Sequence, residues 1–90
     1  MVSSPALRTK HARTLQALFH RPVLGTIRWA DIEALLMALG AEREQREGSR
    51  VAFIWKAQVF VFHRPHPEPV ADKGAVASLR RILQTNGVTP

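Results

Sequence analysis

Ninety residues, 46% of them apolar and 22% charged, are typical of one small globular domain and not of a disordered tail. The absence of cysteine excludes a disulfide framework, a thiol nucleophile and any cysteine-ligated metal or cluster. No apolar run is long enough to cross a bilayer, and residues 1–10 contain no signal-peptide stretch, so we expect a cytoplasmic protein without a membrane partner.

The formal net charge is +6, and ten of the thirteen cations are arginine. Residues 1–29 carry five cations and no acid, residues 30–47 have a net charge of −3, and residues 48–90 have a net charge of +4. This distribution predicts a basic face built from the two ends of the chain. Such a face favours a polyanionic partner, which is nucleic acid or an acidic protein.

Apolar periodicity predicts two helices in the first half of the chain, over residues 7–20 and 29–39. Pro22 ends the first helix, and Gly40 is placed to end the second in a left-handed cap. Their core-facing positions are Leu15, Leu18 and Phe19 in the first helix and Ile32, Leu35, Leu36 and Leu39 in the second.

Three strands are predicted next. Residues 41–47 are polar and of mixed charge, which is typical of an exposed edge strand. After a turn at Gly48-Ser49, residues 50–55 and 58–63 are rich in β-branched and aromatic side chains. The connection at Lys56-Ala57 is short enough for a hairpin, although it lacks the usual Asn-Gly pair.

Three prolines make residues 64–71 an extended loop. Asp72 is placed to cap a last helix over residues 73–85, and Asn86-Gly87 ends it, with Val88 making the apolar contact that follows such a cap. The order predicts an α+β fold. An N-terminal helix precedes an α-β-β-β-α core like that of a double-stranded-RNA-binding domain, in which a three-stranded antiparallel sheet has its helices packed on one face.

Both faces of the predicted sheet carry large apolar groups. Val51, Phe53 and Trp55 alternate with Ala52 and Ile54 along one strand. One layer of helices cannot cover both faces, so either the first helix covers the second face or that face remains an exposed patch.

Several short motifs in order give the sequence a resemblance to the HicA toxins of bacterial toxin–antitoxin pairs, over roughly residues 26–89. They are the helix segment 31–36 with Leu39-Gly40, the Gly48-Ser49 turn, the basic segment 63–67, and the tail from Lys73 to Val88. On this basis we expect a single domain, 1–90, in which residues 1–25 form a helical extension and connector and residues 26–89 form the toxin-like core.

The resemblance implies an RNA-binding toxin that cleaves mRNA without a metal or other cofactor and is neutralised by a HicB-like antitoxin. The family signature is Gly-Ser-His, with the histidine as the catalytic residue. Here Gly48-Ser49 is followed by Arg50. Two hypotheses therefore remain. The protein is an mRNA endoribonuclease, or it is a catalytically inactive RNA-binding or protein-interaction module on the same fold.

Metal-free RNA cleavage needs a base for the 2′-hydroxyl proton, a cation for the phosphorane, and an acid for the leaving oxygen. His66 and His63 are the candidate catalytic residues, because histidine suits both proton transfers. His66 also matches a histidine that the family often carries before the last helix. The alternative is that residues 63–67 form a rigid, solvated loop without a catalytic role. His11 and His20 are interpreted as surface residues.

The predicted RNA-binding residues lie on the hairpin, the proline loop and the last helix: Arg50, Lys56, Arg64, Lys73, Arg80 and Arg81. Arg28, Arg46 and the first helix could extend that surface. The alternative for Arg50 is an ion pair with Glu47.

Three other functions carry less support. Four aromatic residues could stack bases but fit core positions better: Trp29, Trp55, Phe60 and Phe62. A zinc site formed by His63 and His66 with Glu68 or Asp72 lacks the spacing of known sites. A DNA-binding helix-turn-helix from the first two helices would need a tighter turn than residues 21–28 provide.

Overall fold

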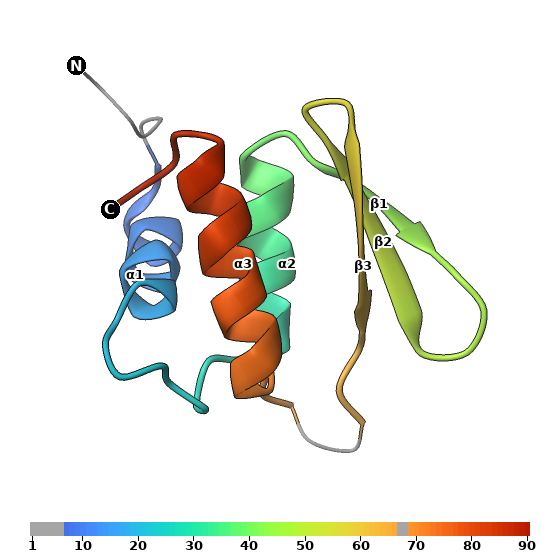
Figure 1. The fold of residues 1–90 in the computed structure, drawn as a ribbon, viewed down its shortest axis with the longest axis horizontal. Coiled ribbons are helices and arrows are strands. Elements are labelled where there is room, and N and C mark those ends of the chain that lie inside the picture. Colours follow the sequence, from blue (N-terminus) through green and yellow to red (C-terminus); the bar gives the residue numbers. More distant parts are fainter. Residues whose placement is uncertain (1–6, 67–68) are drawn as a thin grey trace.

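The computed structural model describes residues 7–66 and 69–90. Within them, three helices and three strands follow the predicted order (Figure 1). The elements are α1 (Thr9–Leu18), α2 (Trp29–Ala38), β1 (Glu42–Gln45), β2 (Arg50–Trp55), β3 (Gln58–His63) and α3 (Lys73–Thr85). The α+β prediction is confirmed, and the predicted bounds of β2, β3 and α3 agree with the observed ones.

The helix ends follow local capping chemistry. Asp72 Oδ1 accepts a hydrogen bond from the Ala75 backbone N–H at 2.7 Å, so the predicted N-cap of α3 is confirmed. Gly87 takes a positive φ of 80°, and the buried Val88 donates its N–H to the Leu83 carbonyl, which closes the helix as expected.

Three elements are shorter than predicted, and α2 differs by the single residue Leu39, which is its C-cap and not part of the helix. Helix α1 covers Thr9–Leu18 and not residues 7–20, because its N-cap residue, Arg8, makes no side-chain cap and the chain leaves helical geometry at Phe19. Strand β1 covers Glu42–Gln45 and not residues 41–47. Its ladder with β2 ends at the pair Gln45 and Val51, where the turn begins.

The sheet is antiparallel with the strand order β1-β2-β3. Helices α2 and α3 pack on one of its faces, and α1 lies on the far side of these two helices, away from the sheet (Figure 1). Val51, Phe53 and Trp55 of β2 are 5% exposed or less and fill the space between sheet and helices. Burying such a side chain stabilises the fold by about 1.5–3 kcal/mol.

The outer face of the sheet is not covered by α1. Val59 is 56% exposed and Val61 is 48% exposed, and the register places them opposite Ile54 and Ala52. Of the two alternatives for this face, the exposed patch is therefore the one observed. No helix among the described residues combines the length and apolar character needed to cross a bilayer.

Candidate nucleic-acid interface

The connector before α2 and the loop before α3 are tied together at one end of the molecule, next to the end of β3 (Figure 1). The Trp29 N–H donates to the Pro69 carbonyl at 2.9 Å, and the Ala71 N–H donates to the Ile27 carbonyl at 2.9 Å. Because Ile27 and Ala71 are also buried, this junction is a fixed part of the core. It holds the starts of α2 and α3 beside the basic loop.

A cavity of about 500 Å³ opens at this junction, and we call it the histidine pocket. Its lining joins the end of β3, the proline loop, the connector and the first residues of α2 and α3. The lining residues are Gly25, Trp29, His63, Arg64, Pro65, His66, Val70, Ala71, Asp72, Lys73 and Ala75. The structure thus brings four of the predicted site residues to one pocket.

Both candidate catalytic histidines line this pocket and are exposed. His63 is the last residue of β3, and its Nδ1 lies 3.4 Å from the Ser49 hydroxyl, within hydrogen-bonding distance. His66 follows Pro65 in the loop. Both side chains can therefore meet solvent or a ligand in the same cavity.

Lys73 brings a cation to the pocket from the first turn of α3. Its side-chain stem lies against Gly25, because a Cβ placed on Gly25 would come within 3.2 Å of Lys73 Cε. In the described part of the chain, Lys73 forms no ion pair. The N-terminus of α3 adds partial positive charge beside it, although the carboxylate of Asp72 already caps that end.

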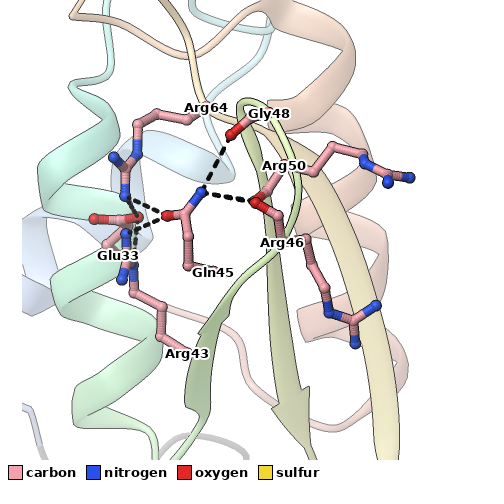
Figure 2. Close-up of polar contacts among 7 residues, drawn as sticks. All are labelled: Glu33, Arg43, Gln45, Arg46, Gly48, Arg50 and Arg64. Carbon is pink, nitrogen blue, oxygen red and sulfur yellow. Dashed lines mark hydrogen bonds and ion pairs between the residues drawn. The ribbon is translucent and has the colours of Figure 1, made fainter.

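Arg64 also lines the pocket and is held by an acid. Its Nη2 lies 3.8 Å from Glu33 Oε2, which also binds Arg43 Nε at 3.0 Å. Figure 2 shows the two guanidinium groups on either side of Glu33, with Gln45 bridging them to the backbone of the β1–β2 turn. These half-exposed pairs are worth less than about 1 kcal/mol each, but they fix the direction of Arg64.

Arg50 does not line the pocket. It is exposed at the start of β2, where its Cα lies opposite that of His63 in the sheet register. The ion pair with Glu47, which was the alternative for Arg50, is absent from the described residues. Instead, the Arg50 backbone N–H donates to the Glu47 carbonyl at 3.3 Å. Position 50 is therefore a direct cross-strand neighbour of His63.

The other predicted RNA-binding residues lie away from the histidine pocket. Lys56 is at the opposite end of the hairpin, with its Nζ 5.3 Å from the Trp55 ring. Arg80 is half-buried, while Arg81 is exposed. They lie seven and eight residues beyond Lys73 on α3, which is roughly 10–12 Å along the helix axis.

No three of the residues His, Cys, Asp and Glu converge on a metal site in the described chain. Glu68, one of the ligands considered for zinc, lies outside the described residues. Gly25 and Trp29 also line the histidine pocket, although the sequence did not identify them as site residues. A glycine shortly after Pro22 signals close approach to another chain segment, but only the fold shows that the segment is α3.

The fold and its pocket define a small, basic α+β domain with the layout of double-stranded-RNA-binding domains. Within that class the sequence matches the family described as HicA toxin of bacterial toxin–antitoxin over residues 29–88, which are 60 of the 90 residues. The chain belongs to this family, as the sequence motifs predicted, and is the toxin of such a pair. No curated protein and no solved structure matched the chain.

Proposed function

We propose that this toxin binds mRNA at the histidine pocket and cleaves it without a metal, and that a HicB-like antitoxin holds it inactive. The observation that carries the proposal is the pocket itself. It brings His63, His66 and Lys73 together from a strand, a loop and a helix, although they are up to ten residues apart in the chain. These residue types are the ones that metal-free RNA cleavage requires.

The cleavage step is an internal transfer of the phosphate. A neutral histidine takes the proton of the 2′-hydroxyl, and that oxygen attacks the adjacent phosphorus. The bond from phosphorus to the 5′-oxygen breaks, and a protonated histidine gives its proton to that oxygen. The products are a 2′,3′-cyclic phosphate and a 5′-hydroxyl, so no water or metal is consumed in this step.

The residues of the pocket divide these tasks. His63 and His66 supply the base and the acid, and the Ser49 contact orients the His63 ring. Lys73 provides the charge for the phosphorane, because in the described chain no carboxylate pairs with it. Arg64 is less free, since Glu33 holds its guanidinium, and it serves as a fixed contact for the RNA backbone.

A second candidate function rests on Arg50. In the family signature this position carries the catalytic histidine, and an arginine cannot act as a base near neutral pH. If His63 and His66 do not replace it, the toxin binds RNA and blocks translation without cutting. Cleavage and binding therefore have to be measured separately.

The test compares three single histidine variants of the toxin under an inducible promoter. Wild-type protein should arrest growth and degrade mRNA. His66→Ala and His63→Ala should relieve the arrest and lower the cleavage rate by about 10²–10⁴-fold, the contribution of a general acid or base. His20→Ala is the matched control, because His20 is exposed and lies outside the pocket.

Unfolding curves of all four proteins should overlap, because the three side chains are exposed. Coexpression of an adjacent HicB-like gene should restore growth. Growth of the wild-type strain at the uninduced rate, with intact RNA, would contradict the proposed function. RNA binding by the wild type without any cleavage would favour the second function.

A further inference from the structure

Helix α1 and the connector after it enclose a second cavity, of about 390 Å³, which we call the extension pocket. It lies mostly in the part of the chain that precedes the family match. The lining residues are Lys10, Arg13, Thr14, Ala17, Leu24, Thr26, Ile27, Arg28 and Asp31.

Three cations reach this pocket. Lys10, Arg13 and Arg28 are all exposed, and none forms an ion pair within the described residues. Asp31 is the one carboxylate in the lining, so the lining side chains carry a net charge of +2. Arg28 is also the N-cap residue of α2 and makes no side-chain cap, and the helix end adds partial positive charge. The pocket is thus suited to an anion.

The two pockets lie on either side of the same connector. Gly25 lines the histidine pocket, whereas its neighbours Leu24 and Thr26 line the extension pocket. The same division recurs at the start of α2, where Arg28 lines the extension pocket and Trp29 the histidine pocket. The connector is fixed between them by its hydrogen bonds to the loop before α3. A flexible chain of anions can therefore occupy both pockets by crossing one segment of backbone.

We infer that the extension pocket is a second phosphate-binding site for the RNA strand held in the histidine pocket. This inference rests on the proposed RNA binding and adds that α1 and the connector lengthen the bound strand. A single-stranded RNA fits the arrangement because its backbone bends freely and carries one phosphate per nucleotide. An acidic segment of the antitoxin is the competing occupant, and the experiment separates the two.

The test measures the affinity of the full-length toxin for 2′-O-methyl RNA, which lacks the attacking hydroxyl and cannot be cleaved. Two oligonucleotides are used, of about four and about twelve nucleotides, so that one fills a single pocket and the other reaches both. The variant is Arg13→Gln/Arg28→Gln. The matched control is Arg8→Gln/Arg21→Gln, which removes the same charge from two exposed arginines outside both pockets.

The pocket variant should bind the longer RNA about tenfold more weakly than the control variant does. The slope of log K against log salt concentration should also become shallower by about 1.4, because two phosphate contacts are lost. The shorter RNA should bind both variants equally. Asp31→Asn should have the opposite effect and raise the affinity for the longer RNA, because a repelling carboxylate is removed.

Equal binding of the longer RNA to both double variants would overturn the inference. Loss of antitoxin binding in the pocket variant, with RNA binding kept, would assign the pocket to the antitoxin and overturn it as well. Failure of the wild type to bind either RNA would instead refute the proposed function. The two failures are therefore distinguishable.

Discussion

Position 50 shows how one residue separates the two candidate functions. The register of β2 and β3 places Arg50 opposite His63. The next pair along, Ser49 and Arg64, is a hydrogen-bonded pair, because the Arg64 N–H donates to the Ser49 carbonyl. Antiparallel pairs alternate, so Arg50 and His63 form a non-hydrogen-bonded pair, in which side chains lie closest. A histidine at position 50 would therefore stand beside His63.

This geometry predicts the outcome of Arg50→His. The substitution restores the family signature and adds an imidazole next to His63, so the cleavage rate at saturating RNA should rise about tenfold or more. Arg50→Gln is the matched variant, because it removes the same charge without supplying a base. Both should weaken RNA binding to the same extent. An equal cleavage rate for the two variants would contradict the prediction.

The same residues show what sequence can predict about a site. The pattern around His63 and His66 identified them as candidates, and Lys73 was named for its charge. Their convergence was not predictable, because it depends on the pairing of Ile27 with Ala71, which are 44 positions apart in the chain. Arg64 was predicted to bind RNA, and only the fold reveals Glu33 beside it.

At the scale of elements, the β2–β3 turn is the clearest case of local strain. Lys56 and Ala57 have φ values of 51° and 62°, in the left-handed region that a two-residue hairpin of this kind requires. Residues with a Cβ adopt this region at a cost of roughly 1–2 kcal/mol. The alternation of β2 and β3 is strong enough to predict the hairpin even though the turn residues oppose it.

Ala57→Gly should therefore stabilise the protein. The relief of strain exceeds the extra chain entropy of glycine in the unfolded state, which leaves a gain of about 0.5–1 kcal/mol in the free energy of unfolding. Ala34→Gly in the middle of α2 is the control, where the same change should cost about 1 kcal/mol. Urea unfolding measures both, and a loss of stability for Ala57→Gly would refute the strain argument.

Across the whole molecule, α1 is part of the core and not an appended segment. Leu15 is 2% exposed and Leu18 is 1% exposed, and both belong to the same cluster as Leu35 and Leu79. The three-residue apolar stripe of α1 indicated a helix but not its partner. Periodicity shows which face is buried, whereas the layer that buries it follows from the whole fold. For this reason the sequence could not predict whether α1 covers the outer face of the sheet.

Shortening a core side chain of α1 should therefore destabilise the entire protein. Leu18→Ala should lower the free energy of unfolding by about 2–5 kcal/mol, because a small domain cannot collapse fully around the lost side chain. This is a large share of the ~5–15 kcal/mol that holds a domain folded. Gln16→Ala, at an exposed position of the same helix, should change the free energy of unfolding by less than about 0.5 kcal/mol.

If α1 were a separate extension, Leu18→Ala would leave the cooperative urea transition unchanged. Tryptophan fluorescence reports Trp29 and Trp55 in the rest of the core. If Leu18→Ala shifts the urea midpoint seen by fluorescence to the same extent as the midpoint seen by circular dichroism, α1 folds as one unit with the matched family region.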